Sequence, residues 1–301
     1  ALRRHYGWAW YQRKVTLPAF CAGQRVVLRF GSVTHTAKVW LNGQLIAQHK
    51  GGFTPFEADV TALLRPGETV LLTVACDNRV NHSTLPVGNE DGQLAFFGSD
   101  NAGIPSVEAA KRAAAPQNRP NFDFFNYAGI HRPVWLYTTP KEYIEDVTVV
   151  PAVDGTVQYA VKTTGSAPVH VMVLDADGKA VASAEGAEGT ITIPEVHLWE
   201  PRPGTPYLYT LHITCGADVY DQSFGVRSIE VRGTQVLLNG KPLYFKGFCK
   251  HEDFTAHGRG FDPVLNVKDV NLIHWANANA VRTSHYPYAE ELYDLCDREG
   301  I

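Results

Sequence analysis

Asn279-Ala280-Val281-Arg282-Thr283-Ser284-His285-Tyr286-Pro287 is the stretch of this chain that decides its fold. A short apolar run leads there into an arginine, two hydroxyls, a histidine and a tyrosine. Apolar spacing predicts a helix upstream over Val267–Ala276 and a second helix downstream over Ala289–Arg298. In a (β/α)8 barrel, the residues that follow each strand face the active site. The polar cluster therefore predicts a site, although an ordinary strand end capped by Ser or Thr has the same spacing.

The first of these helices has a mostly apolar face in its sequence pattern. We expect that face to be buried and the polar residues between its members to face water. The expected buried residues are Val267, Val270, Ile273 and Trp275, and the expected exposed ones are Lys268, Asp269 and Asn271. Tyr244–Phe248 is predicted to be the strand before this helix, and Ala280–Thr283 the strand after it. The pattern therefore predicts two βα units.

The chain before these units is predicted to be all β. From Trp8 to about Pro140, short runs rich in Val, Leu and aromatic residues alternate with turn residues, which is typical of a sandwich or jelly roll. A second series, from about Glu142 to Arg232, has the size of an immunoglobulin-like sandwich. Asn42-Gly43 and Asn239-Gly240 predict hairpins, because Asn-Gly accepts the positive φ of a type I′ turn.

Val87–Pro120 breaks this pattern with many Gly, Asn, Pro and Ala residues. We interpret it as an insertion, since an irregular segment this long is uncommon in a compact domain. Its composition allows a helix over Ser106–Ala115.

Four stretches, which together reach across almost the whole chain, resemble glycoside hydrolase family 2, and within it the bacterial β-glucuronidases. They are Gly51–Val60, Asp123–Arg132, Phe248–Asp253 and Arg282–Asp294. The resemblance implies a jelly-roll sugar-binding domain over 1–140 and an immunoglobulin-like β-sandwich over 141–232. It implies the first βα units of a (β/α)8 TIM barrel over 233–301. Both ends are expected to be truncated relative to the family.

The same resemblance implies a set of substrate-binding residues. Asp123 would reach from the first domain into the barrel mouth and accept hydrogen bonds from two adjacent sugar hydroxyls, with a capping Asp as the alternative. His285 resembles the family histidine that lines the sugar pocket, and His251 is also expected to approach the substrate. Arg282 would either orient a catalytic carboxylate or pair structurally within the barrel.

The implied chemistry is double displacement by two glutamates roughly 5 Å apart. Neither family motif that carries them occurs in this sequence, so both catalytic residues are expected after Ile301. Glu252 and Asp253 cannot replace them, because neighbours on an extended segment point in opposite directions. We therefore expect a fragment that is inactive alone.

The implied substrates are glucuronide small molecules or glycans that carry a terminal β-D-glucuronic acid. The Asn and Lys with which the family recognises the sugar carboxylate would also follow Ile301. A β-galactosidase, a β-mannosidase and a non-catalytic carbohydrate-binding remnant therefore stay open as alternatives.

Composition narrows the classes of partner. The chain is 45% hydrophobic and 19% charged, with a formal net charge of −4 and no basic runs, so we expect neither nucleic acid nor membrane as a partner. His251, Glu252, His257 and Asp262 have the spacing of no standard metal site, and no cofactor is indicated.

The cysteines and the start of the chain bear on the compartment. Five scattered cysteines predict neither a disulfide framework nor a zinc site, which fits a reducing compartment. No signal peptide or membrane span is recognisable. We expect a cytoplasmic bacterial protein that is homo-oligomeric at full length.

Overall fold

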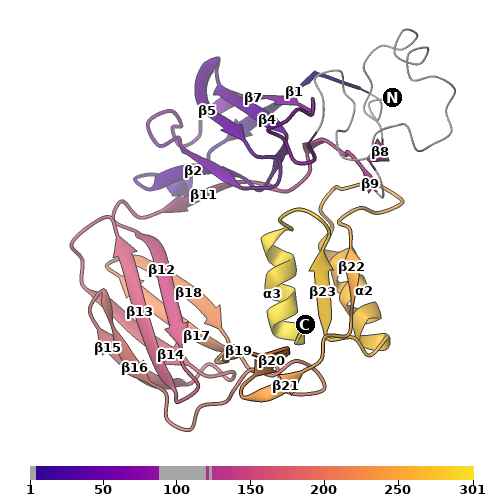
Figure 1. Cartoon of the computed structure of the whole chain (residues 1–301). Helices are drawn as coiled ribbons and strands as arrows, with labels where there is room; N and C mark the ends of the chain where they lie inside the picture. Colours follow the sequence, from indigo (N-terminus) through magenta and orange to yellow (C-terminus); the bar gives the residue numbers. More distant parts are fainter. Residues whose placement is uncertain (1–4, 88–119, 122–123) are drawn as a thin grey trace, which may run out of the picture. The chain divides into compact units, whose positions relative to one another are not determined.

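The computed structural model of the chain describes residues 5–87, 120–121 and 124–301 (Figure 1). Apart from its end residues Val87 and Pro120, the predicted insertion therefore lies outside the described residues, as does its helix. Contacts divide the chain into two compact units, each built from separate stretches of sequence. The first comprises Ala1–Thr138, His251–Phe261 and Thr283–Ala289, and the second comprises Thr139–Lys250, Asp262–Arg282 and Glu290–Ile301.

The first unit contains a β-sandwich whose two sheets have the orders β1-β7-β4-β5 and β11-β2-β6. Because side chains alternate along each strand, every second one enters a shared core that includes Phe30, Val39 and Val74. The strands of the first sheet are β1 (Trp8–Thr16), β7 (Thr69–Asp77), β4 (Thr36–Leu41) and β5 (Gln44–Lys50). Those of the second sheet are β11 (Val134–Thr139), β2 (Arg25–Phe30) and β6 (Phe56–Asp59).

The first unit also contains shorter elements. They are the 3₁₀ turn η2 (Ala19–Cys21) and the pairs β3 (Val33–Thr34) with β10 (Gly129–Ile130) and β8 (Pro120–Asn121) with β9 (Phe124–Phe125). The predicted hairpin between β4 and β5 is confirmed, with φ of 47° at Asn42 and 85° at Gly43. The Asn42 side chain also accepts a hydrogen bond from the Leu71 N–H at 2.8 Å, which ties the turn to β7.

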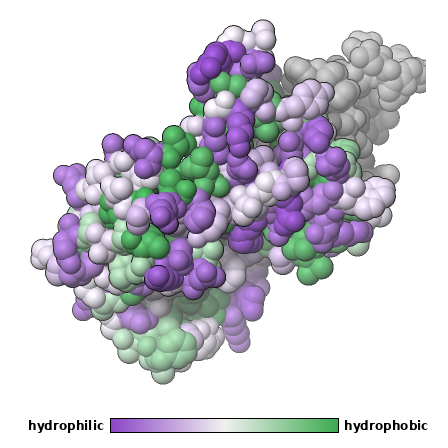
Figure 2. All heavy atoms as spheres, turned by 90° about the horizontal axis from the view of Figure 1, so that it is seen from below, coloured by the Kyte–Doolittle hydropathy of each residue, from purple (hydrophilic) through white to green (hydrophobic). Residues whose placement is uncertain are grey.

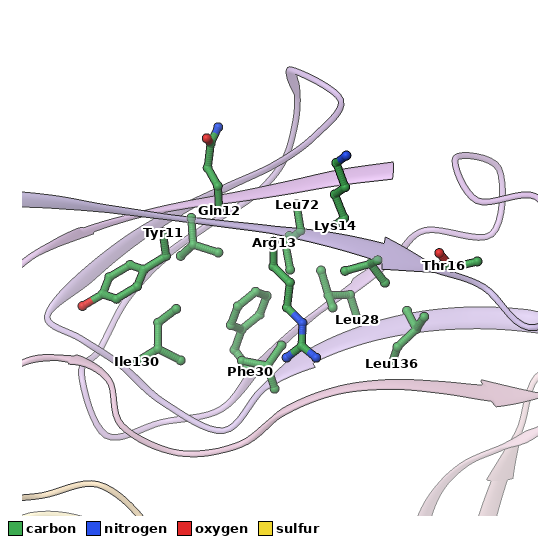
Figure 3. Close-up of a pocket in the computed structure, with 13 residues that line it drawn as sticks. Tyr11, Gln12, Arg13, Lys14, Thr16, Leu28, Phe30, Leu72, Ile130 and Leu136 are labelled. Atoms are coloured by element: carbon green, nitrogen blue, oxygen red, sulfur yellow. The ribbon is translucent and has the colours of Figure 1, made fainter. Parts of the chain in front are cut away.

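Side chains of the end strand β1 extend alternately to its two sides. Figure 3 shows Tyr11 and Arg13 extending toward Phe30, whereas Gln12 and Lys14 extend to the opposite side. Residues of both sides help to line a cavity of about 560 Å³ together with residues of β2 and β11. An inward-pointing charge on an end strand, here Arg13, discourages pairing with a further sheet.

The second unit contains another β-sandwich, with sheets in the orders β12-β13-β16 and β15-β14-β17-β18. Along β17, Tyr209, Leu211 and Ile213 are buried, and the residues between them are less so, as period-two alternation requires. The strands of the first sheet are β12 (Ile144–Pro151), β13 (Thr156–Thr163) and β16 (Glu188–Thr192). Those of the second sheet are β15 (Ala180–Glu185), β14 (Val169–Leu174), β17 (Tyr209–Cys215) and β18 (Asp218–Phe224).

A small sheet of order β19-β20-β21 follows this sandwich. Its strands are β19 (Ile229–Arg232), β20 (Gln235–Leu238) and β21 (Lys241–Leu243). The predicted hairpin between the last two is confirmed, with φ of 51° at Asn239 and 75° at Gly240. The Asn239 side chain donates to the Trp199 carbonyl at 3.0 Å, which joins the hairpin to the chain that precedes β17.

The first predicted βα strand begins later than expected. The strand is β22 (Gly247–Lys250), and Tyr244 is 80% exposed before it. β22 pairs with β23 (Ala280–Thr283), whose predicted bounds are confirmed. An added Cβ at Gly247 would collide with the Ala280 carbonyl, so the start of β22 requires a residue without a side chain.

The helix α2 (Pro263–Trp275) begins before the predicted start at Val267. Asp262 caps it by accepting from the Val264 N–H at 2.9 Å and the Leu265 N–H at 3.2 Å, and proline suits the first helical position. The predicted buried face of this helix is wrong in part. Its buried residues are Asn266, Val270 and Ile273, at i, i+4 and i+7, whereas Val267 is 46% and Trp275 85% exposed.

The helix α3 (Glu290–Glu299) lies within one residue of its predicted range. Gly300 follows it with a φ of 77°, and its N–H donates to the Cys296 carbonyl at 2.9 Å, as in a left-handed helix cap. No helix in the described part of the chain is long and apolar enough to cross a membrane. Figure 2 shows one face of the surface, on which hydrophilic residues are interspersed with hydrophobic groups.

Candidate functional site

A buried ion pair anchors the segments that follow β22 and β23 in the chain. Arg132 Nη2 donates to Glu252 Oε2 at 3.0 Å and to the Pro287 carbonyl at 2.6 Å, and its Nη1 donates to the Phe53 carbonyl at 3.0 Å. Glu252 Oε1 in turn accepts from the Ala289 N–H at 2.8 Å. Only 6% of the Arg132 side chain and 8% of the Glu252 side chain are exposed. One planar guanidinium thus holds three separate segments in register.

A second buried arginine packs against aromatic rings in the same unit. The Arg259 guanidinium lies 4.5 Å from the ring centroid of Tyr286 and 5.1 Å from that of Phe53. These two rings stack on each other with centroids 4.4 Å apart. The Tyr286 hydroxyl accepts from the Glu252 N–H at 3.0 Å, and burial raises the pKa of Tyr286, so the phenol stays protonated. Contacts with Arg259, Phe53 and the Glu252 backbone therefore fix the position of the Tyr286 side chain.

His251 and His285 lie next to each other on these anchored segments. Their ring centroids are 5.6 Å apart and their planes meet at 83°, in an edge-to-face arrangement. His285 is exposed and His251 is half-buried. A neutral imidazole offers one donor and one acceptor, so two of them this close can hold neighbouring hydroxyls of one small ligand.

Two further histidines are buried in the interior of this unit. His131 lies 2.8 Å from Ser32 Oγ through Nε2 and 2.9 Å from Thr34 Oγ1 through Nδ1, and His35 Nε2 lies 3.1 Å from Asn126 Oδ1. Burial lowers the pKa of His35 to about 4 and, together with the charges of two buried arginines, the pKa of His131 to about 3. Both rings are therefore neutral in the physiological range.

The structure brings together two of the four residues that were predicted to form the site. His251 and His285 come together as described. Asp123 lies outside the described residues. Arg282 belongs to the second unit, where it is exposed on β23. The roles assigned to these four residues stay predictions.

The structure also shows residues that sequence reasoning did not single out, chiefly Arg132 and Asn126. Both lie inside the quoted stretch Asp123–Arg132, where a cation and an amide stand among aromatic and small residues. This contrast in residue type is the sequence feature by which Arg132 and Asn126 could have been singled out. The partner of Arg132 could not be found this way, because Glu252 is 120 residues distant along the chain.

Comparison with known families accounts for nearly every residue. Three family models match in succession: "Glycosyl hydrolases family 2, sugar binding domain" over residues 1–140, "Glycosyl hydrolases family 2" over 142–227, and "Glycosyl hydrolases family 2, TIM barrel domain" over 229–301. The chain belongs to glycoside hydrolase family 2. The predicted fold class, with a sugar-binding domain, a second β-sandwich and the start of a TIM barrel, is thereby confirmed.

Two relatives of this family 2 chain carry the same name. It is 43% identical to a β-glucuronidase of Paenibacillus borealis and 44% identical to that of Canis lupus familiaris. All of the chain is covered in both alignments, against 50% and 48% of the two relatives. The chain therefore spans about half the length of the curated relatives that it matches.

Solved structures agree with this placement in family 2. A structure named Faecalibacterium prausnitzii β-glucuronidase superposes with a TM-score of 0.94 at 96% identity, covering 100% of this chain and 50% of the other. The β-glucuronidase of Bifidobacterium dentium, complexed with coumarin-3-O-glucuronide, gives a TM-score of 0.91 at 51% identity, covering 100% and 52%.

Proposed function

We propose that these residues form the substrate-holding part of a retaining glycoside hydrolase that removes terminal β-D-glucuronic acid from glucuronides. The observation that carries the proposal is the 96% identity, over the whole chain, to the structure named Faecalibacterium prausnitzii β-glucuronidase. The complex of the Bifidobacterium dentium relative with coumarin-3-O-glucuronide supports glucuronide small molecules as the substrate class.

Within this function, His251 and His285 hold hydroxyls of the sugar ring. Their edge-to-face arrangement, with ring centroids 5.6 Å apart, supports this role, because two imidazoles at that separation can each bind a hydroxyl of one pyranose. Asp123 accepts hydrogen bonds from two adjacent hydroxyls, and Arg282 orients a carboxylate of the catalytic pair. The Arg132–Glu252 pair keeps the two histidine-bearing segments in place.

Cleavage of the glycosidic bond requires two carboxylic acid side chains in addition to these binding residues. In a retaining hydrolase one glutamate attacks the anomeric carbon, and a second protonates the leaving oxygen and later activates water. Glu252 serves neither role, because its two carboxylate oxygens are occupied by Arg132 and the Ala289 N–H. We therefore expect no hydrolysis from the 301-residue chain alone.

The test compares this chain with the complete product of its gene on p-nitrophenyl β-D-glucuronide, β-D-galactoside and β-D-mannoside. The gene product should release p-nitrophenol from the glucuronide in strong preference to the other two, and the 301-residue chain should release none. A preference for galactoside or mannoside would overturn the proposed substrate. Turnover by the 301 residues would contradict the proposed division of roles.

We also propose that the protein is cytoplasmic and homo-oligomeric. Its proposed domains span residues 1–140, 141–232 and 233–301. The limits of the three matching family models support these boundaries. All five cysteines are free thiols, which supports a reducing compartment. Size-exclusion chromatography with light scattering on the complete gene product tests the oligomer.

A further inference from the structure

Two buried tyrosines follow His285 in the sequence and belong to the same unit. Burial alternates over 284–288, where the first, third and fifth residues are buried and His285 is exposed. The buried residues include Tyr286, which is 5% exposed, and Tyr288, which is 2% exposed. Their rings stack with centroids 5.1 Å apart and planes inclined by 25°. The segment therefore presents a histidine at the surface and anchors a pair of stacked rings in the interior.

The Tyr286 hydroxyl is tied to the backbone beside the other histidine of the proposed site. It accepts a hydrogen bond from the Glu252 N–H at 3.0 Å. This N–H belongs to the peptide bond that joins His251 to Glu252. Tyr286 is itself bonded to His285, 34 residues further along the chain than His251. One side chain therefore connects the backbone at the first histidine to the backbone at the second.

The Tyr288 hydroxyl is tied to the backbone on the other side of His285. It donates to the Ser284 carbonyl at 3.2 Å, and Ser284 is fully buried. This carbonyl belongs to the peptide bond that joins Ser284 to His285. The His285 backbone is thus held on its N-terminal side by the Tyr288 hydroxyl and on its C-terminal side by the anchored Tyr286.

Burial makes both of these contacts exacting. A buried backbone group that loses its partner is costly, so the Glu252 N–H and the Ser284 carbonyl keep the two hydroxyls in place. A tyrosine has only two side-chain torsions, and stacking restricts them further. Groups that bind a substrate must be held within about 0.5 Å of their productive positions. The stacked tyrosines supply such a constraint between the two histidine-bearing segments.

We propose that Tyr286 and Tyr288 are positioning residues for glucuronide hydrolysis, and that their hydroxyls set the separation of the His251 and His285 rings. The proposal rests on the function proposed above, in which these two histidines hold hydroxyls of the sugar. The tyrosines act through the histidines, since both are buried. Loss of either hydroxyl releases one backbone contact, so that the two imidazoles no longer bind hydroxyls of one ring together.

Tyr286→Phe and Tyr288→Phe test the proposal in the complete gene product, because each keeps the stacked ring and removes one hydroxyl. Each should lower kcat/KM for p-nitrophenyl β-D-glucuronide about tenfold, since small misplacements of binding groups slow a reaction strongly. Tyr209→Phe is the matched control. It removes a buried hydroxyl of the second unit, which accepts from the His197 N–H at 2.9 Å. All three variants should lower the thermal midpoint of unfolding by similar amounts, but Tyr209→Phe should keep the parent kcat/KM.

A second readout follows the two histidine rings directly and needs no substrate. In the 301-residue chain, the edge-to-face rings of His251 and His285 should give a nuclear Overhauser effect between their ring protons. This cross-ring effect should weaken in Tyr286→Phe and in Tyr288→Phe, and it should be unchanged in Tyr209→Phe.

The outcomes separate the proposal from a purely structural role of the tyrosines. An unchanged cross-ring effect or a parent value of kcat/KM in either Tyr286→Phe or Tyr288→Phe would overturn it. An equal kinetic loss in Tyr209→Phe would do the same, because loss of any buried hydroxyl would then have the effect. A parent that hydrolyses no glucuronide would instead overturn the proposed function. The cross-ring effect would then decide alone whether the tyrosines set the separation of the histidines.

Discussion

The Arg132 guanidinium and the Glu252 carboxylate meet at 3.0 Å, with more than nine-tenths of each side chain buried. A buried ion pair is not by itself strong evidence for stability, since desolvation of the two charges opposes their attraction. This pair is unusual in its additional contacts, because its two members together bind the backbone at Phe53, Pro287 and Ala289. It therefore joins the N-terminal sandwich to two segments that lie far along the chain.

Removal of one partner should be strongly destabilising. Arg132→Met leaves the Glu252 carboxylate buried without its counter-charge, so the free energy of unfolding should fall by about 3–5 kcal/mol. Urea titration followed by tryptophan fluorescence measures the loss. Arg29→Met is the matched control, because the Arg29–Glu57 pair at 2.8 Å is partly exposed and should contribute at most about 1 kcal/mol. Equal losses in the two variants would contradict the special role of Arg132.

Replacement of both partners should cost less than removal of one. In the double variant Arg132→Met with Glu252→Leu no uncompensated charge remains, so part of the stability lost in Arg132→Met should return. The same urea titrations give the coupling energy from a double-mutant cycle. Strict additivity of the two single losses would show that the two side chains do not interact.

Acidification should destabilise the first unit well before the carboxylates are protonated. His35, with a pKa of about 4, and His131, with a pKa of about 3, are both depressed below the unfolded value near 6.5. The unfolded chain thus binds more protons between pH 6.5 and pH 4, and stability is lost as the pH falls through that range. For His35 alone the loss at pH 4.5 should be about 2–3 kcal/mol. Urea midpoints at pH 7.5 and 4.5 measure it, and His131→Asn should lose less than the parent does.

The core of the second sandwich should respond to cavity creation. Leu211 is fully buried on β17, so Leu211→Ala should lower the free energy of unfolding by about 2–5 kcal/mol. Val219 lies on the neighbouring β18 and is 55% exposed, so Val219→Ala should stay within about 0.5 kcal/mol of the parent. Thermal unfolding followed by circular dichroism compares them. Similar losses would mean that Leu211 does not lie in a packed core.

The proposed sugar contact of His285 predicts an effect on catalysis. In the complete gene product, His285→Ala should lower kcat/KM for p-nitrophenyl β-D-glucuronide by roughly 10- to 100-fold, since a sugar hydroxyl loses its partner. The exposed His82 provides the control, and His82→Ala should keep the parent value. Unchanged kinetics in His285→Ala would remove this residue from the proposed site.

Much of the secondary structure could be predicted because it depends on local patterns. The strand range Ala280–Thr283 follows from a short β-branched and apolar run, and it was predicted with the observed bounds. The start of β22 was missed because it depends on the close approach of Gly247 to Ala280 in another strand. The exposed side of α2 was missed for a similar reason, since tertiary packing selects which apolar residues of a helix are buried.

The candidate site was predictable only in part. His251 and His285 could be named from their motifs, because each follows a short strand of the barrel pattern. That their rings lie 5.6 Å apart could not be derived, since their segments are brought together by folding. Neither could the ion pair of Arg132, whose partner is 120 residues away.

The sequence by itself therefore determined the order of the domains, the hairpins at Asn-Gly, the helices and the family, because each of these depends on residues close together in the chain. Only the tertiary structure decided that 251–261 and 283–289 pack in one unit with 1–138, and that Arg132 pairs with Glu252 in the interior of that unit. Both results depend on burial and on contacts between distant segments. Burial determines which charges need a partner and which polar atoms go without one, and local sequence does not encode it.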